Sequence, residues 1–128
     1  MIPLFLSTEE VQALHFSQIE AWGGSHGLRD AGALESAVAA PQNHYVYGAG
    51  DLFDYAAALM FALILNHPFL DGNKRAGTLA AAVTLEMNGV LLRDDPTWLA
   101  ELENLAWRAA KAEASREDLA AVLRSGAV

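Results

Sequence analysis

The chain has 128 residues, 16 acidic against 8 basic side chains, a net charge of −8 and no cysteine. This length suits one domain with a buried core, and the lack of cysteine excludes disulfides and thiolate metal sites. The negative charge disfavours nucleic-acid binding and docking on anionic membranes, because both need a basic face. We therefore expect one domain over residues 1–128, with neither nucleic acid nor membrane as a direct partner.

The apolar stretches predict neither a signal peptide nor a membrane segment. Residues 1–7 lack a basic start before their short apolar run, and the longest apolar run covers only residues 55–65. A membrane-spanning helix takes about 20 apolar residues. These features lead us to expect a cytoplasmic protein.

The residue pattern predicts an all-α chain. Alanine and leucine are abundant, and no run of β-branched residues alternates with polar ones as it would in a strand. Capping residues, glycines and prolines then divide the chain into six expected helices. They cover residues 8–22, 31–40, 51–67, 73–88, 96–113 and 116–125.

Three local features set the expected arrangement of these helices. Ser7 with Glu10 forms a capping box, in which each side chain satisfies a free backbone N–H at the start of the first helix. Pro41 is expected to stop the second helix, which leaves residues 41–50 as a loop. The third helix is apolar almost all round, so we expect it to be central and buried.

The preference for acidic residues at a helix N-terminus is violated at the start of the fourth expected helix, where Lys74 and Arg75 stand in the first turn. A helix N-terminus is electropositive, so each cation there costs a few tenths to about 1 kcal/mol unless an anion binds. A bound phosphate reverses this, because the free backbone N–H groups and both side chains can hold it together. Gly72 has no side chain and lets such a ligand approach the backbone closely. The segment therefore predicts an anion site.

Other groups suited to phosphate transfer stand close by in the sequence. His67 can be neutral near pH 7 and can take a proton from an attacking hydroxyl. Asp71 offers hard oxygen ligands for Mg²⁺, and Asn73 offers an amide for a phosphate oxygen. Taken singly, the histidine and aspartate could be helix caps, the Gly-Asn pair a turn and the cations solvated charges. The order and spacing of the whole set favour the chemical interpretation.

The run from His67 to Arg75, His-Pro-Phe-Leu-Asp-Gly-Asn-Lys-Arg, resembles the signature of the Fic/Doc family. A second stretch, residues 26–37, resembles the upstream segment of the death-on-curing (Doc) toxin branch. The resemblance covers nearly the whole chain. It implies an all-α, single-domain Fic fold with the motif loop between two central helices.

The resemblance also implies a role for each motif residue. It makes His67 the general base and lets Asp71 hold Mg²⁺ on the phosphates of ATP. Gly72 and Asn73 would form the anion hole, and Arg75 would contact phosphate. Most members of the family transfer AMP from ATP to a protein hydroxyl.

Position 74 separates two activities within the family. AMP-transferring members usually have glycine where this chain has Lys74, and the Doc branch has lysine. The resemblance to Doc implies that ATP binds in reverse, so that its γ-phosphoryl group faces a Ser or Thr hydroxyl of translation elongation factor Tu. Gly72 favours AMP transfer instead, because Doc has alanine at this position and AMP-transferring members have glycine. Three functions stay open: a Doc-like toxin kinase, an AMP- or nucleotidyl-transferase, and a catalytically silent Fic-like binding protein.

Regulation is expected to come from a separate protein. Some family members carry an inhibitory Ser/Thr followed four residues later by Glu. In this chain Val11 follows Ser7 at that spacing and Leu119 follows Ser115, so the motif is missing. The hypothesis is a small antitoxin that inhibits in trans.

Two further groups of residues are candidates for binding. Arg29, Asp30 and Glu35 could line the nucleotide or antitoxin site, although a helix cap by Asp30 and an ion pair by Arg29 or Glu35 are better expectations. The aromatic segment 44–47, with His44, Tyr45 and Tyr47, could align the target chain as a flap does in Fic folds. The four histidines lack the paired spacing of a zinc site.

Overall fold

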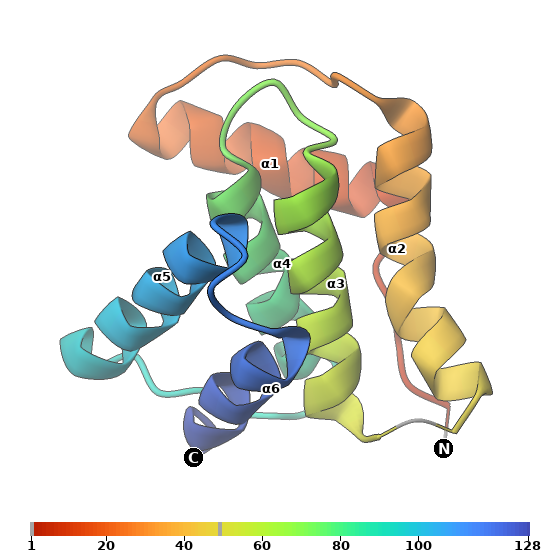
Figure 1. Ribbon diagram of the computed structural model, residues 1–128, viewed down its shortest axis with the longest axis vertical. Coiled ribbons are helices and arrows are strands. Elements are labelled where there is room, and N and C mark those ends of the chain that lie inside the picture. The colour runs from red at the N-terminus through yellow and green to blue at the C-terminus, as the bar shows by residue number, and fades with distance from the viewer. Residues whose placement is uncertain (1, 49) are drawn as a thin grey trace.

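The computed structural model describes residues 2–48 and 50–128, and these residues form six helices and no strand (Figure 1). This confirms the predicted all-α fold. Within the same ranges no helix is long and apolar enough to cross a membrane. The helices are α1 Thr8–Trp22, α2 Ala31–Val46, α3 Leu52–Asn66, α4 Asn73–Met87, α5 Pro96–Ala110 and α6 Arg116–Ser125.

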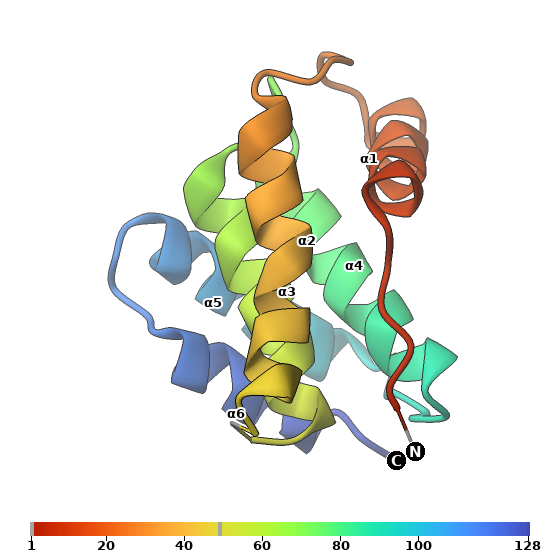
Figure 2. The same ribbon diagram turned by 90° about the vertical axis from the view of Figure 1, so that its right-hand side faces the viewer.

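Helix α3 is central because it is apolar on every face, as predicted. Eight of its side chains are buried, between Tyr55 and Ile64. One part of the core joins α3 and α4 to α1 and α2, and a second part joins them to α5 and α6. Figures 1 and 2 show α3 and α4 side by side through the middle of the molecule.

The close approach of α3 and α4 depends on Gly77. A Cβ atom at this position would lie 3.1 Å from the backbone oxygen of Met60 on α3. Backbone cannot retreat from such a contact as a flexible side chain can, so the glycine lets the two helices pack closely. This pairing fixes the ends of both helices that flank the motif loop.

The second helix is longer than the sequence predicts, since α2 continues through Pro41. Proline in a helix interior removes one backbone hydrogen bond and costs about 3 kcal/mol or more. The ring of Pro41 is buried, and one turn later the ring of Tyr45 packs against Phe5 and Tyr55, at centroid distances of 6.1 and 5.9 Å. These tertiary contacts offset the loss, so the loop predicted for residues 41–46 was wrong.

The fifth helix is shorter than predicted and ends at Ala110. Ala112 takes a left-handed conformation with φ of 61°, and the backbone N–H of Glu113 donates to the carbonyl of Arg108 at 2.7 Å. This hydrogen-bond pattern closes a helix C-terminus and is usually formed around glycine. Because alanine fills the position here, the sequence gives no glycine to mark the end.

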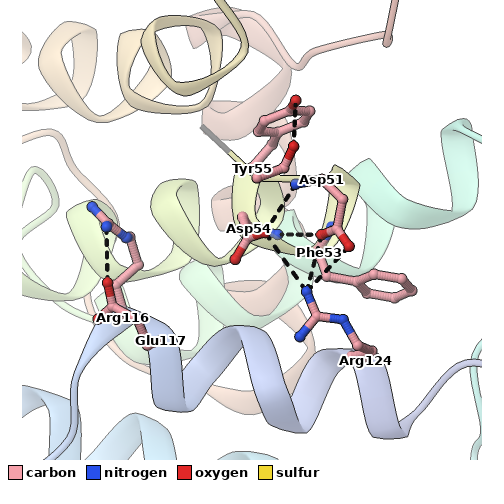
Figure 3. Close-up of polar contacts among 8 residues, drawn as sticks. Asp51, Phe53, Asp54, Tyr55, Arg116, Glu117 and Arg124 are labelled. Atoms are coloured by element: carbon pink, nitrogen blue, oxygen red, sulfur yellow. Dashed lines mark hydrogen bonds and ion pairs between the residues drawn. The ribbon is translucent and has the colours of Figure 1, made fainter. Parts of the chain in front are cut away.

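Helix α6 is fastened to the start of α3 by charged groups (Figure 3). The Arg124 guanidinium donates to both oxygens of Asp51, at 3.1 and 3.2 Å, and lies 3.6 Å from Asp54. Burial acts to raise the pKa of Asp51, but hydrogen bonds from Asp54 and Arg124 outweigh it and lower the pKa below its usual value. This cluster lies at the opposite end of α3 from the motif loop (Figure 1).

Candidate active site

The motif loop begins where α3 ends, at His67. Its backbone is left-handed, with φ of 48° and ψ of 57°, and so lies outside both the right-handed helical region and the extended region that a following proline favours. The exposed Arg29 side chain satisfies the carbonyl groups at this helix end: Nε donates to the His67 oxygen at 2.6 Å, and Nη2 donates to the Asn66 oxygen at 2.8 Å. Arg29 therefore holds the backbone of the proposed base.

This finding corrects the ion pair expected of Arg29 or Glu35. Arg29 bonds to carbonyl groups instead of an acid, and Glu35 forms no ion pair within the described residues. The expected cap is confirmed, since Asp30 Oδ1 accepts from the backbone N–H of Ala33 at 3.0 Å.

Residues 23–30 run beside the motif loop (Figure 1). Leu28 and Phe69 form an isolated antiparallel bridge. The backbone N–H of Arg29 donates to the Pro68 carbonyl at 2.7 Å, and the N–H of Leu70 donates to the Gly27 carbonyl at 3.1 Å. The segment between α1 and α2 is thus the immediate neighbour of the motif, while its residues are exposed.

The aromatic segment 44–47 lies elsewhere. It sits at the far end of α2, where Tyr45 packs into the core and His44 Nε2 lies 3.0 Å from Arg116 Nη1 on α6. Figure 1 shows this end of α2 opposite the motif loop. The segment therefore cannot align a target at His67, and the expectation of a flap there was wrong.

Asn73 locks the shape of the motif loop. Its buried side chain accepts a hydrogen bond from the Phe69 N–H and donates one to the Phe69 carbonyl, both at 3.0 Å. Its Nδ2 also lies 3.4 Å from His67 Nδ1. The amide predicted to hold phosphate is thus occupied by the loop, which leaves the backbone N–H of this residue for an anion.

His67 is exposed at the surface of this loop. The 3.4 Å approach of Asn73 is at the long limit for a hydrogen bond, and because an amide nitrogen only donates, His67 Nδ1 can only be the acceptor in it. An exposed imidazole on a rigid turn is accessible to the hydroxyl group of another protein.

The N-terminus of α4 is open, as the anion-site prediction requires. Its N-cap, Gly72, is left-handed with φ of 74° and ψ of 21°, and no side chain caps the helix. Among the described residues, no acceptor bonds the backbone N–H groups of positions 73–75; the first such bond runs from Ala76 to the Gly72 carbonyl at 2.9 Å. Three donors therefore remain for a ligand.

The two cations of the first turn lie on different sides of this helix end. Lys74 Nζ lies 4.8 Å from the centre of the Trp107 ring on α5. Arg75 Nη2 donates to the Gly23 carbonyl at 3.2 Å. Both side chains are half-buried and line a groove of about 940 Å³ between α4 and α5. They have partners and are not simply solvated charges.

Asp71 keeps its negative charge beside this helix end. Hydrogen bonds from the backbone N–H groups of Ser25 at 3.2 Å and Gly72 at 2.8 Å lower the pKa of Asp71. No set of three acidic or histidine side chains in residues 2–48 and 50–128 could form a metal cage. A single exposed carboxylate fits Mg²⁺ that arrives with phosphates, because that ion usually keeps several waters and takes few protein ligands.

His15 contacts the site, which the sequence did not predict. It is 3% exposed, its Nε2 lies 2.7 Å from the Asp71 carbonyl oxygen, and its ring stacks on Phe69 at 3.8 Å. Burial lowers the pKa of His15, so the ring is neutral at pH 7. The available signal was its place between Val11 and Ile19, four residues from each on the buried face of α1.

Comparisons with known proteins identify the family of this chain. The sequence model of the Fic/DOC family matches residues 5–85, which include α1 to α3, the motif loop and most of α4. The chain is 36% identical to "Protein kinase doc" of Escherichia phage P1 over 120 residues, 93% of this chain and 92% of that protein. It is 47% identical to "Toxin Doc" of Mycolicibacterium smegmatis over 78 residues, 59% of each chain. The chain belongs to the Fic/DOC family.

Proposed function

We propose that this chain is a Doc-type toxin that transfers the γ-phosphoryl group of ATP to a Ser or Thr hydroxyl of a protein. The observation that carries the proposal is the exposed His67 at one end of a short loop whose other end is an uncapped helix N-terminus. The proposed base and the proposed phosphate site would then stand at the two ends of one short loop. A relative named as a protein kinase, similar over 93% of this chain, supports the same chemistry.

In the proposed reaction the free N–H groups of α4 bind the phosphates together with Lys74 and Arg75. His67 takes the proton of the acceptor hydroxyl while the hydroxyl oxygen bonds to the γ-phosphorus. The bond between the γ-phosphorus and the oxygen that bridges it to the β-phosphorus breaks, which releases ADP. Asp71 would hold Mg²⁺, which neutralises charge on the phosphates when bound.

Lys74 supports phosphoryl transfer over AMP transfer. Its side chain fills space that glycine leaves open in AMP-transferring members, and its ammonium group stands on the α5 side of the helix end. AMP transfer is the second candidate, because Gly72 is the residue typical of that activity. A silent binding protein is the third, and the intact set of motif residues disfavours it.

The exposed segment 23–28 is the proposed docking edge for the target, which by analogy is translation elongation factor Tu. It already pairs with the motif loop through one edge, so an extended target segment on its other edge would bring a hydroxyl close to His67. The proposed use of ATP and of a translation factor supports a location in the cytoplasm.

The proposed regulator is a small antitoxin protein, since both named relatives are Doc proteins and one is named a toxin. The groove between α4 and α5 is the proposed place for an antitoxin segment. It is lined by exposed Leu91, Leu99 and Trp107, and it reaches Lys74 and Arg75. An occupant would therefore block the cations at the phosphate site.

Labelled ATP separates the candidates. The chain is incubated with purified elongation factor Tu, or with cell extract, and ATP labelled on either the α- or the γ-phosphate. Label on protein from the γ position alone supports the kinase, and label from the α position supports AMP transfer and contradicts the kinase. His67→Ala should abolish transfer and toxicity. His44→Ala, at the far end of α2, is the matched histidine control and should change neither.

A further inference from the structure

His15 lies against the motif loop but takes no part in the reaction proposed above. It comes from the middle of α1 and is 56 residues away from its partner Asp71 in the sequence. Its ring is parallel to that of Phe69, with an interplanar angle of 3° and a centroid distance of 3.8 Å. Buried stacking of this kind fixes the orientation of the imidazole.

The hydrogen bond of His15 determines which nitrogen carries its proton. The partner of Nε2 is a carbonyl oxygen at 2.7 Å, which can only accept, so Nε2 must donate. The bond therefore holds the Asp71 carbonyl group in a fixed direction.

A fixed Asp71 carbonyl also fixes the N–H of Gly72. These two groups belong to one planar peptide unit and point in opposite directions, so neither can turn without the other. The Gly72 N–H now donates to Asp71 Oδ1 at 2.8 Å, on the side of the peptide away from His15. Glycine itself supplies no side chain that would otherwise hold this peptide in place.

We propose that His15 is a positioning residue that orients the Asp71–Gly72 peptide, and with it the Asp71 carboxylate that accepts from the Gly72 N–H and the open N-terminus of α4 that follows. This assignment rests on the proposed function in naming phosphate as the ligand of the N-terminus of α4. The orientation of the peptide is a separate statement about the chain itself, and it can be measured without a substrate.

Two substitutions separate the hydrogen bond from the packing. His15→Gln places an amide nitrogen near the position of Nε2 and keeps a donor, whereas His15→Leu fills similar space without one. Both remove the stacked ring, so the difference between them reports the donor. Amide hydrogen exchange of residues 70–73 is measured together with kcat/KM for ATP, and urea unfolding checks that both variants are folded.

We expect His15→Leu to speed exchange of the Gly72 amide by roughly 3- to 10-fold, the size expected for loss of one hydrogen bond. It should lower kcat/KM by a similar factor, and His15→Gln should restore both values. Equal exchange at Gly72 in the two variants would overturn the proposal, whether or not the chain uses ATP. If the wild-type chain transfers nothing from ATP, the proposed function fails, and the exchange comparison still decides the role of His15.

Discussion

Gly72→Ala tests whether the left-handed backbone at the start of α4 is a structural requirement. Gly72 has φ of 74°, a conformation that costs an L-residue about 1–2 kcal/mol. A new Cβ atom would also lie 3.1 Å from Cδ1 of Ile19 on α1, closer than the 3.5–4.0 Å optimum of carbon contacts. This neighbour is the end of a flexible side chain, so most of the cost should come from the backbone.

The expected loss is therefore about 1–2 kcal/mol in the free energy of unfolding. For a domain of this size it corresponds to a fall of about 4–7 °C in Tm. Urea unfolding gives the free energy, and its m-value shows whether the folded state stays compact.

Ile19→Val supplies the matched control, because it removes Cδ1, the atom closest to the new Cβ. Alone it should cost about 0.5–1.5 kcal/mol. If backbone strain dominates, the costs of the two substitutions should add to within about 0.5 kcal/mol in the double variant. A Gly72→Ala variant as stable as the wild type would refute the claim that the left-handed backbone requires glycine. If the costs of the two substitutions do not add in the double variant, the loss of stability comes from the contact with Ile19 and not from the backbone.

Three other substitutions probe separate parts of the molecule. Arg29→Met removes the donors to the carbonyl groups at the C-terminal end of α3. It should lower the free energy of unfolding in urea by roughly 1 kcal/mol and slow phosphate transfer. Unchanged transfer would show that the backbone of His67 does not need these hydrogen bonds. Asp51→Asn keeps a capping side chain but removes its negative charge, so the wild type should be more stable than the variant at pH 7. The difference in Tm between the two proteins should disappear as the pH falls below about 4 and then through the lowered pKa of Asp51, because the wild-type carboxylate becomes protonated there. Trp107→Leu removes the aromatic ring that the Lys74 ammonium group contacts. Such a cation–π contact at an exposed site is worth about 0.5–1 kcal/mol. If Lys74 must leave the ring to reach phosphate, the KM for ATP should therefore fall by roughly 2- to 5-fold in this variant.

Most of the fold could be predicted because helix signals are local. Capping residues marked the starts of α1, α2 and α6, and the continuous apolar character of α3 marked it as central. The prediction that α2 ends before Pro41 was wrong, because tertiary contacts outweigh the local effect of the proline. Proline weakens a helix, but the packing of Tyr45 beyond it outweighs that loss, and nothing in the neighbouring sequence reveals the aromatic partners.

The chemical groups of the candidate site could also be predicted, because they stand together in the motif. Their orientation could not, because it comes from residues far away in the sequence. Arg29 reaches the backbone of His67 across 38 residues, and His15 reaches the backbone of Asp71 across 56. Both side chains bond only to backbone carbonyl groups, for which any donor would serve, so residue type gives no signal.

These two contacts divide the work of holding the motif loop. Arg29 fixes the end of the loop that carries His67, and His15 fixes the end that opens into the N-terminus of α4. Asn73 joins the two ends through the backbone of Phe69 between them. Catalysis by positioning would require the proposed base and the proposed phosphate site to keep a constant separation, because a displacement of about 1 Å can cost about 100-fold in rate. The loop is held at both ends and in the middle, which is the arrangement that such a requirement demands.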